Sequence, residues 1–105
     1  MDDLNNKVLV MGSTGMLGHK VVQYLLEHSK FNIIDLSHRK KLRKSSILID
    51  AMNKSELVEA INDLKPNYIV NCIGDLVSTK VDYERAIYLN SYLPHLLKKV
   101  ASSLN

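Results

Sequence analysis

The sequence has no tryptophan and only one cysteine among its 105 residues. A lone cysteine, Cys72, cannot form an internal disulfide, and such cysteine usage favours the reducing cytoplasm. No apolar run approaches the roughly 20 residues that a membrane-spanning helix needs. The polar, acidic start at residues 1–6 does not resemble a secretory signal. We therefore expect a cytoplasmic protein without a membrane partner.

Aromatic residues are also few, and none is interleaved with the basic cluster at residues 39–44. Surfaces that bind single-stranded nucleic acids combine basic and aromatic side chains, so we expect no nucleic-acid partner. The net charge is only +3, and much of it lies in this cluster. The cluster is either a solvated loop or an anion-binding patch, and the sequence leaves both interpretations open.

Three of the four glycines are spaced three residues apart, at Gly12, Gly15 and Gly18. They follow the apolar run at residues 8–11 and open an amphipathic helical pattern. A strand that turns through glycines into a helix binds phosphate through free backbone N–H groups, assisted by the helix dipole. Gly18 is expected to allow close packing of the helix on the sheet instead. A purely structural turn is the alternative interpretation.

The apolar periodicity predicts alternating strands and helices in one domain, residues 1–105. Strands are expected at residues 7–11, 32–37, 46–49 and 68–72. Helices are expected at residues 16–28, 54–64 and 82–103, the last interrupted by Pro94. Asn53 is the expected N-cap of the second helix. The first helix is expected to bury a stripe of Leu17, Val21, Val22, Leu25 and Leu26.

This alternation predicts an α/β fold, a Rossmann-type doubly wound parallel sheet, here partial with four strands in the order 3-2-1-4. Ligands bind such sheets at the carboxyl ends of the strands, where the strand order reverses. Gly12, Ser37, Asp50 and Gly74 lie at these ends. We therefore expect a nucleotide site there.

The spacing Gly12-x-x-Gly15-x-x-Gly18 resembles the extended short-chain dehydrogenase/reductase superfamily. Asp50 resembles the family's acidic residue after the third strand, which binds the adenine amino group; its alternative role is to cap the next helix. Residues 71–74 resemble the turn after the fourth strand, which lies along the cofactor. Residues 65–72 and 90–94 are similar to the dTDP-4-dehydrorhamnose reductase-like, nucleotide-sugar branch.

The resemblance implies an NAD(P)-dependent oxidoreductase of nucleotide-sugar metabolism and polysaccharide biosynthesis. The implied reaction is hydride transfer to a 4-keto sugar nucleotide. The chain resembles the N-terminal, cofactor-binding portion of such enzymes, because none of its five tyrosines begins the family's catalytic Tyr-x-x-x-Lys. Whether the chain is itself an enzyme stays open, and the alternative is a non-catalytic NAD(P)-binding or scaffold module. The open edge of the strand at residues 68–72 leaves room for self-association.

The cofactor is expected to be NADP rather than NAD, because Ser37 falls where an NAD-binding acid usually lies and Arg39 follows. Asp35 is interpreted as a strand residue satisfied by a neighbour, with ribose binding as its alternative role. Neither catalytic nor metal-binding residues are predicted, and Cys72 is expected to be a small residue at the core's edge. The expected cofactor-binding residues are Gly12, Thr14, Gly15, Met16, Leu17, Ser37, Arg39, Asp50, Ala51, Cys72, Ile73 and Gly74.

Overall fold

A computed structural model describes residues 6–74 and 82–104 of the chain. Four parallel strands form one sheet in the order β3-β2-β1-β4. They are β1 (Lys7–Met11), β2 (Asn32–Ser37), β3 (Ile47–Leu48) and β4 (Tyr68–Asn71). The predicted Rossmann-type fold and its strand order are confirmed.

Two strands are shorter than predicted. β3 begins after Ser46, whose side chain is used in a buried network described below, although the Ile49 N–H still donates to the Ser37 carbonyl at 2.9 Å. β4 ends at Asn71, whose side-chain oxygen accepts from the Ile73 N–H at 3.0 Å and so turns the chain. β4 therefore ends in a turn at the carboxyl edge of the sheet.

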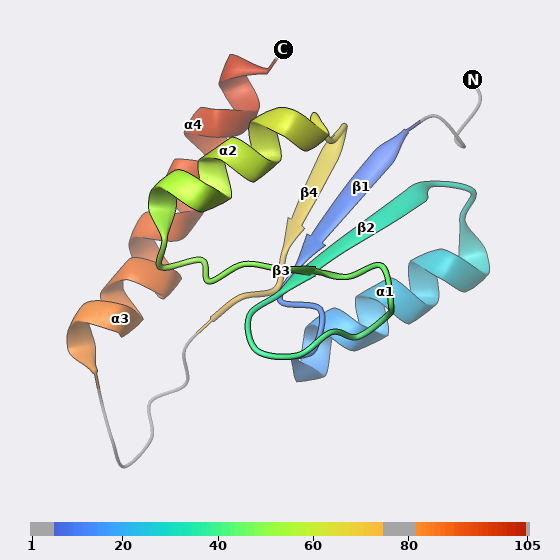
Figure 1. Ribbon diagram of the computed structural model, residues 1–105, viewed down its shortest axis with the longest axis horizontal. Coiled ribbons are helices and arrows are strands. Elements are labelled where there is room, and N and C mark those ends of the chain that lie inside the picture. The colour runs from blue at the N-terminus through green and yellow to red at the C-terminus, as the bar shows by residue number, and fades with distance from the viewer. Residues whose placement is uncertain (1–5, 75–81, 105) are drawn as a thin grey trace.

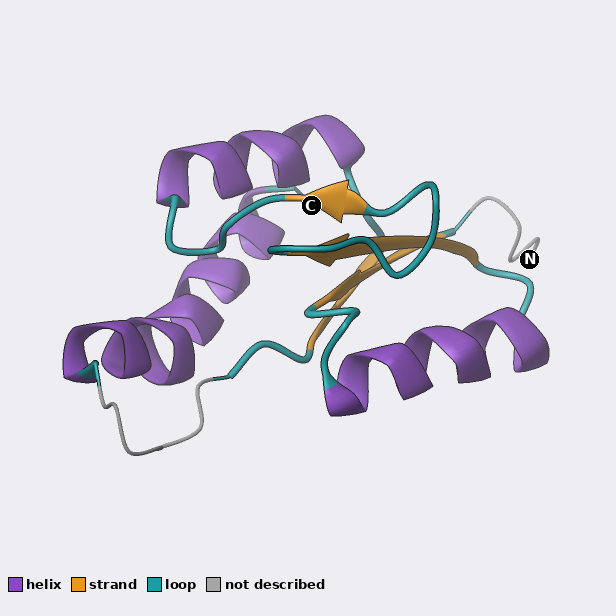
Figure 2. Ribbon diagram, turned by 60° about the horizontal axis from the view of Figure 1, so that its bottom comes forward, coloured by secondary structure: helices purple, strands orange, loops and turns teal. Residues whose placement is uncertain are grey.

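Helices cover both faces of the sheet (Figures 1 and 2). The helix α1 (Met16–His28) lies on one face, and α2 (Lys54–Leu64) and α4 (Leu93–Ser103) lie on the other. Along β1, side chains alternate between the two resulting cores, with Val8 and Val10 packed toward α1 and Leu9 and Met11 toward α2 and α4. All four are buried, as expected for a central parallel strand.

The buried face of α1 differs from the predicted stripe. Val22 is buried and Val21 and Leu25 pack beside it, but Leu17 and Leu26 are 63% and 50% exposed, so their predicted burial is wrong. The reason is Gly18, which lies directly against the glycine turn after β1 and centres the buried face of the helix on itself and Val22.

The other helices begin and end where the sequence indicates. Asn53 caps α2 by accepting from the Glu56 N–H at 3.3 Å, and Lys65 adopts a left-handed conformation with φ of 49° after its last turn. The C-terminal helix has three parts: α3 (Tyr83–Ile87), the π-helical turn η2 (Tyr88–Tyr92) and α4. Pro94 lies in the first turn of α4, where it is tolerated, and the irregularity precedes it as the π-helical turn. No helix in the described ranges is long and apolar enough to span a membrane.

Candidate cofactor-binding site

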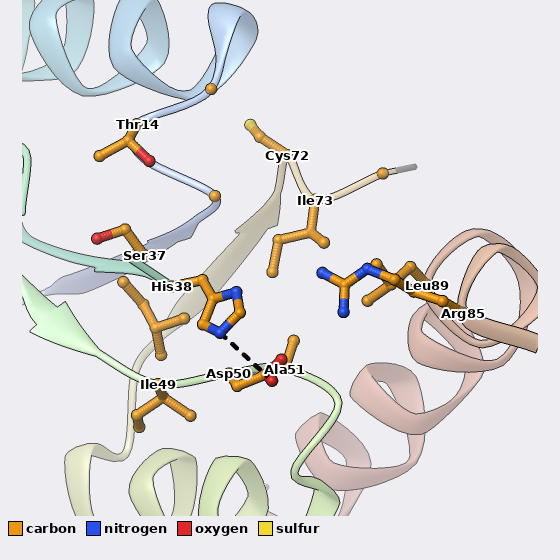
Figure 3. Close-up of a pocket in the computed structure, with 14 residues that line it drawn as sticks. Thr14, Ser37, His38, Ile49, Asp50, Ala51, Cys72, Ile73, Arg85 and Leu89 are labelled. Atoms are coloured by element: carbon orange, nitrogen blue, oxygen red, sulfur yellow. Dashed lines mark ion pairs between the residues drawn. The ribbon is translucent and has the colours of Figure 1, made fainter. Parts of the chain in front are cut away.

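A cleft of about 180 Å³ opens at the carboxyl edge of the sheet, between the start of α1 and α3 (Figure 3). Most of the predicted binding residues line it, whereas Met16, Leu17 and Arg39 do not. Its lining residues are Gly12, Thr14, Gly15, Leu36, Ser37, His38, Ile49, Asp50, Ala51, Cys72, Ile73, Gly74, Arg85 and Leu89. Residues from the ends of all four strands therefore meet at one place, as the topology predicts.

The glycine turn is shaped by contacts that exclude larger residues. Gly12 has a φ of +79°, and a Cβ atom there would lie 3.0 Å from the main-chain carbonyl of Cys72. A Cβ at Gly18 would lie 1.9 Å from the Gly12 oxygen, so the predicted packing role of Gly18 is confirmed. A Cβ at Gly15 would meet only that same oxygen, at 3.4 Å, which is an ordinary contact. Packing within the protein therefore does not require a glycine at position 15, and the missing side chain leaves open space at the start of α1.

The N-terminus of α1 carries no capping side chain. Gly15 is its N-cap, its first turn has no acidic residue, and its first helical hydrogen bond runs from the His19 N–H to the Gly15 carbonyl at 3.1 Å. The amides of Met16 and Leu17 thus have no partner within the helix. Their side chains are 89% and 63% exposed, so their backbone is what they offer to a ligand.

The helices α2 and α3 begin differently from α1. Each has a side-chain cap, Asn53 or Asp82, and a glutamate in its first turn, Glu56 or Glu84. These groups satisfy backbone donors and complement the positive end of the helix dipole. The start of α1 lacks such groups and faces the cleft, which makes it the helix start suited to an anion.

Behind the glycine turn, Asp35 is fully buried and accepts hydrogen bonds from three side chains. Ser13 donates to Oδ2 at 2.6 Å and Ser46 donates to the same atom at 2.5 Å. The Arg43 guanidinium contacts Oδ1 at 2.8 Å through Nε and Nη2, and its Nη2 also donates to the Ile33 carbonyl at 2.8 Å. Asp35 therefore ties the glycine turn to the loop between β2 and β3.

Burial alone would raise the pKa of Asp35, but the hydrogen bonds from Ser13, Ser46 and Arg43 and the Arg43 charge together lower it. Asp35 is thus an internal carboxylate, and its interpretation as a strand residue satisfied by neighbours is confirmed. With no exposed surface, it cannot bind ribose in this structure. Arg43, one cation of the basic cluster, is directed inward to it rather than to a ligand.

At the end of β2, neither Ser37 nor Arg39, the two residues predicted to bind the cofactor there, presents its polar side chain to the cleft. Ser37 lines the cleft but is 2% exposed, and its hydroxyl donates to the Lys40 carbonyl at 2.6 Å. Arg39 is exposed and lies outside the lining residues. The side chain that enters the cleft from this loop is His38, which sequence analysis did not single out.

Asp50 lies across the cleft from His38, and their side chains meet with Nε2 3.3 Å from Oδ2 (Figure 3). The other carboxylate oxygen of Asp50 accepts from the Met52 N–H at 2.9 Å. Asp50 does not cap α2, because Asn53 does. Both side chains remain about two-fifths exposed, so the pair is open to a ligand that enters the cleft.

The far wall of the cleft comes from α3, the π-helical turn η2 and the end of β4. Arg85 and Leu89 line it, and the Arg85 guanidinium points toward Ile73 and Ala51 (Figure 3). No local pattern marks these two residues in the sequence, because only the fold brings their helix to the strand ends. Burial raises the pKa of the Cys72 thiol, and Cys72 packs against the core on the α1 side, as a core-edge residue does. Within the described ranges, no cluster of side chains fits a metal ion.

Comparisons with known proteins agree with this architecture. Several solved structures resemble the chain in fold, among them three that are each under 25% identical in sequence. The first is L-threonine dehydrogenase from Clostridium difficile, with a TM-score of 0.75 and 21% identity over 94% of this chain and 34% of that chain. The second is a hypothetical dTDP-4-dehydrorhamnose reductase from Sulfolobus tokodaii, with a TM-score of 0.80 and 18% identity over 93% of this chain and 36% of that chain. The third is ADP-L-glycero-D-manno-heptose-6-epimerase from Helicobacter pylori, with a TM-score of 0.82 and 19% identity over 98% of this chain and 38% of that chain. The chain thus spans about a third of the length of each.

A search of curated proteins gave no significant match. A family model, described as the NAD dependent epimerase/dehydratase family, matches residues 8–101, which is nearly the whole chain. The match includes all the cleft residues and the whole sheet except Lys7, the first residue of β1. As the glycine spacing predicted, the chain belongs to the NAD dependent epimerase/dehydratase family, within the extended short-chain dehydrogenase/reductase superfamily.

Proposed function

We propose that this chain binds NADP, or NAD, through the cleft and forms the cofactor-binding part of a nucleotide-sugar oxidoreductase. The proposed reaction is hydride transfer to a 4-keto sugar nucleotide. The observation that carries the proposal is the uncapped start of α1, which opens into the same cleft as Asp50 and the turn after β4. An anion site and a polar end within one cleft suit a dinucleotide.

The chemistry of the cleft suggests how a dinucleotide would lie. The amides of Thr14, Met16 and Leu17 would bind the pyrophosphate, whereas the Gly15 N–H already donates to the Gly12 carbonyl at 3.1 Å. Asp50 beside Ala51 would accept from the adenine amino group. The cofactor would then run along residues 72–74. The cleft's volume of about 180 Å³ is below the roughly 300–1,000 Å³ of sites for drug-sized ligands, so it would hold the adenosine end and leave the nicotinamide end outside.

The charge around the end of β2 supports NADP over NAD. Asp35 is the one acidic residue of β2, and it is buried and bonded within the protein. Arg39 and the exposed lysines after it surround the strand end with positive charge. A cationic strand end whose own carboxylate is buried suits a 2′-phosphate better than free ribose hydroxyls.

A second candidate is a non-catalytic NAD(P)-binding or scaffold module. Both candidates require cofactor binding, and a hydride-transfer assay with a 4-keto sugar nucleotide separates them. Self-association through the outer edge of β4 is part of either proposal, because within the described residues no strand pairs with that edge.

The proposal is tested by titration calorimetry of NADP and NAD with the parent chain and the Gly15→Val variant. Valine would fill the space through which a phosphate approaches the backbone, so affinity for both cofactors should fall by about ten-fold or more. The fold should persist, because a Cβ at Gly15 meets only an ordinary contact. The control, Gln23→Val, puts the same side chain at an exposed position further along α1 and should leave affinity unchanged. Equal affinities in parent and Gly15→Val would remove the phosphate-binding role of the turn.

A further inference from the structure

The loop after β2 sends one charged or titratable side chain into the cleft, and that is His38. The other candidates are engaged or directed elsewhere. The Ser37 hydroxyl donates to the Lys40 carbonyl, and the Arg43 guanidinium is held by Asp35. The remaining cations of the loop are exposed and lie outside the lining residues; they are Arg39, Lys40, Lys41 and Lys44.

The charged surroundings of His38 come from several elements. Asp50, after β3, is its direct partner, with Nε2 3.3 Å from Oδ2. Arg85 from α3 and Cys72 from the end of β4 are the other titratable groups lining the cleft, and Tyr88 of η2 interacts electrostatically with Asp50. When the His38 ring is neutral, the cleft therefore has the Asp50 charge at this end. When the ring is protonated, it presents a cation between Asp50 and an incoming anion.

We propose that His38 is the residue that distinguishes a 2′-phosphate from a 2′-hydroxyl group on the cofactor, and that it favours the phosphate only when its ring is protonated. The inference rests on the proposed function, namely that the cleft holds the cofactor's adenosine end. A residue at the carboxyl end of β2 is placed to contact the ribose. A protonated ring donates a charge-assisted hydrogen bond to phosphate, whereas a neutral ring leaves the phosphate facing the Asp50 carboxylate.

A preference that depends on a positive charge on the ring should then decrease as pH rises. An arginine gives the opposite behaviour, since its guanidinium stays charged throughout this range. A 2′-phosphate gains its second negative charge near pH 6, so discrimination by Arg39 alone would increase with pH. The sign of the pH dependence therefore separates the two residues.

The test is calorimetric titration of the full chain with NADP and with NAD, at about pH 6 and about pH 8. The measured quantity is the ratio of the two dissociation constants. Effects at the pyrophosphate end cancel in this ratio, including any from His19, whose Nδ1 lies 2.8 Å from the Gly15 carbonyl. In the parent chain, the preference for NADP should fall by about ten-fold from the lower to the higher pH.

Three variants complete the experiment. His38→Asn and His38→Gln keep a hydrogen-bond donor without the charge, so both should abolish the fall in preference. His38→Arg should restore a preference for NADP that persists at the higher pH. Arg39→Ala should lower the preference at both pH values and keep its decrease with pH. Because His38 is exposed, these variants should fold as the parent does, which thermal unfolding checks.

The outcomes are distinguishable. If both cofactors bind and the ratio changes with pH equally in the parent, His38→Asn and His38→Gln, His38 is not the discriminating residue, while the proposed function stands. If neither cofactor binds to the parent chain at either pH, the proposed function fails and the inference fails with it.

Discussion

Replacing Asp35 by alanine should be among the most destabilising single changes in this protein. Asp35 has no exposed surface, and its carboxylate accepts hydrogen bonds from Ser13, Ser46 and Arg43 at 2.5–2.8 Å. Alanine would leave two buried hydroxyls and one guanidinium without their acceptor. Removing one partner of a buried ion pair costs about 3–5 kcal/mol. The Arg43 side chain is 27% exposed and can regain some hydration, so we expect a loss near the lower value, about 3 kcal/mol.

This loss is large for a chain of 105 residues, whose total stability is expected to be about 5–15 kcal/mol. For a domain of this size it corresponds to a fall in Tm of roughly 10–20 °C. Thermal and urea unfolding followed by circular dichroism would measure it. Asp35→Asn keeps the shape and one acceptor oxygen and should lose less. The matched control, Asp63→Ala, changes an exposed aspartate of α2 and should unfold at the parent's temperature.

The same variants test the charge of Asp35 through pH. Burial raises its pKa, but its hydrogen bonds and the Arg43 charge together lower the pKa by more than burial raises it. The pKa in the folded state therefore lies below the ordinary value. A carboxylate of this kind stabilises the fold above about pH 4 and loses its contribution as pH falls through the lowered pKa. The parent should thus lose stability below about pH 4 more steeply than Asp35→Asn. An Asp35→Ala variant that unfolds within about 1 kcal/mol of the parent, or equal acid sensitivity of parent and Asp35→Asn, would refute this account of the network.

Two further predictions concern the cofactor and the sheet edge. Near neutral pH, NADP should bind about 10- to 100-fold more tightly than NAD, and Arg39→Ala should reduce this preference. Added salt should weaken NADP binding more than NAD binding, because the loop that carries Arg39 is exposed. Equal affinities of the parent for the two cofactors in calorimetry would contradict this prediction. The chain should self-associate through the outer edge of β4. Tyr68→Lys places a charge on a half-exposed residue of this edge strand and should shift the chain toward monomer in sedimentation velocity. A parent chain that stays monomeric at every concentration would contradict the role of the edge.

The sequence alone determined the elements, their order and the location of the cleft. Periodicity in the apolar residues places strands and helices, and right-handed crossovers then allow few strand orders, of which 3-2-1-4 is the one observed. The glycine spacing determined the turn, since Gly12 and Gly18 lie where a Cβ atom would strike the backbone. Asn53 was identifiable as a cap because capping depends on residues only three positions apart. These are local or topological rules, and a single sequence carries them.

Only the tertiary structure decided which side chains enter the cleft and which are turned away from it. Leu17 and Leu26 fit a helical stripe, but the close contact of Gly18 with the glycine turn rotates them to the surface. Arg43 belongs to a basic run in the sequence, yet Asp35 draws it inward, and this leaves His38 to face Asp50. Contacts of this kind join residues distant in the chain, such as Ser13 and Asp35, and their strength depends on burial. Residue spacing does not encode burial, so the roles of Asp35, His38 and Arg43 emerge only from the packed fold.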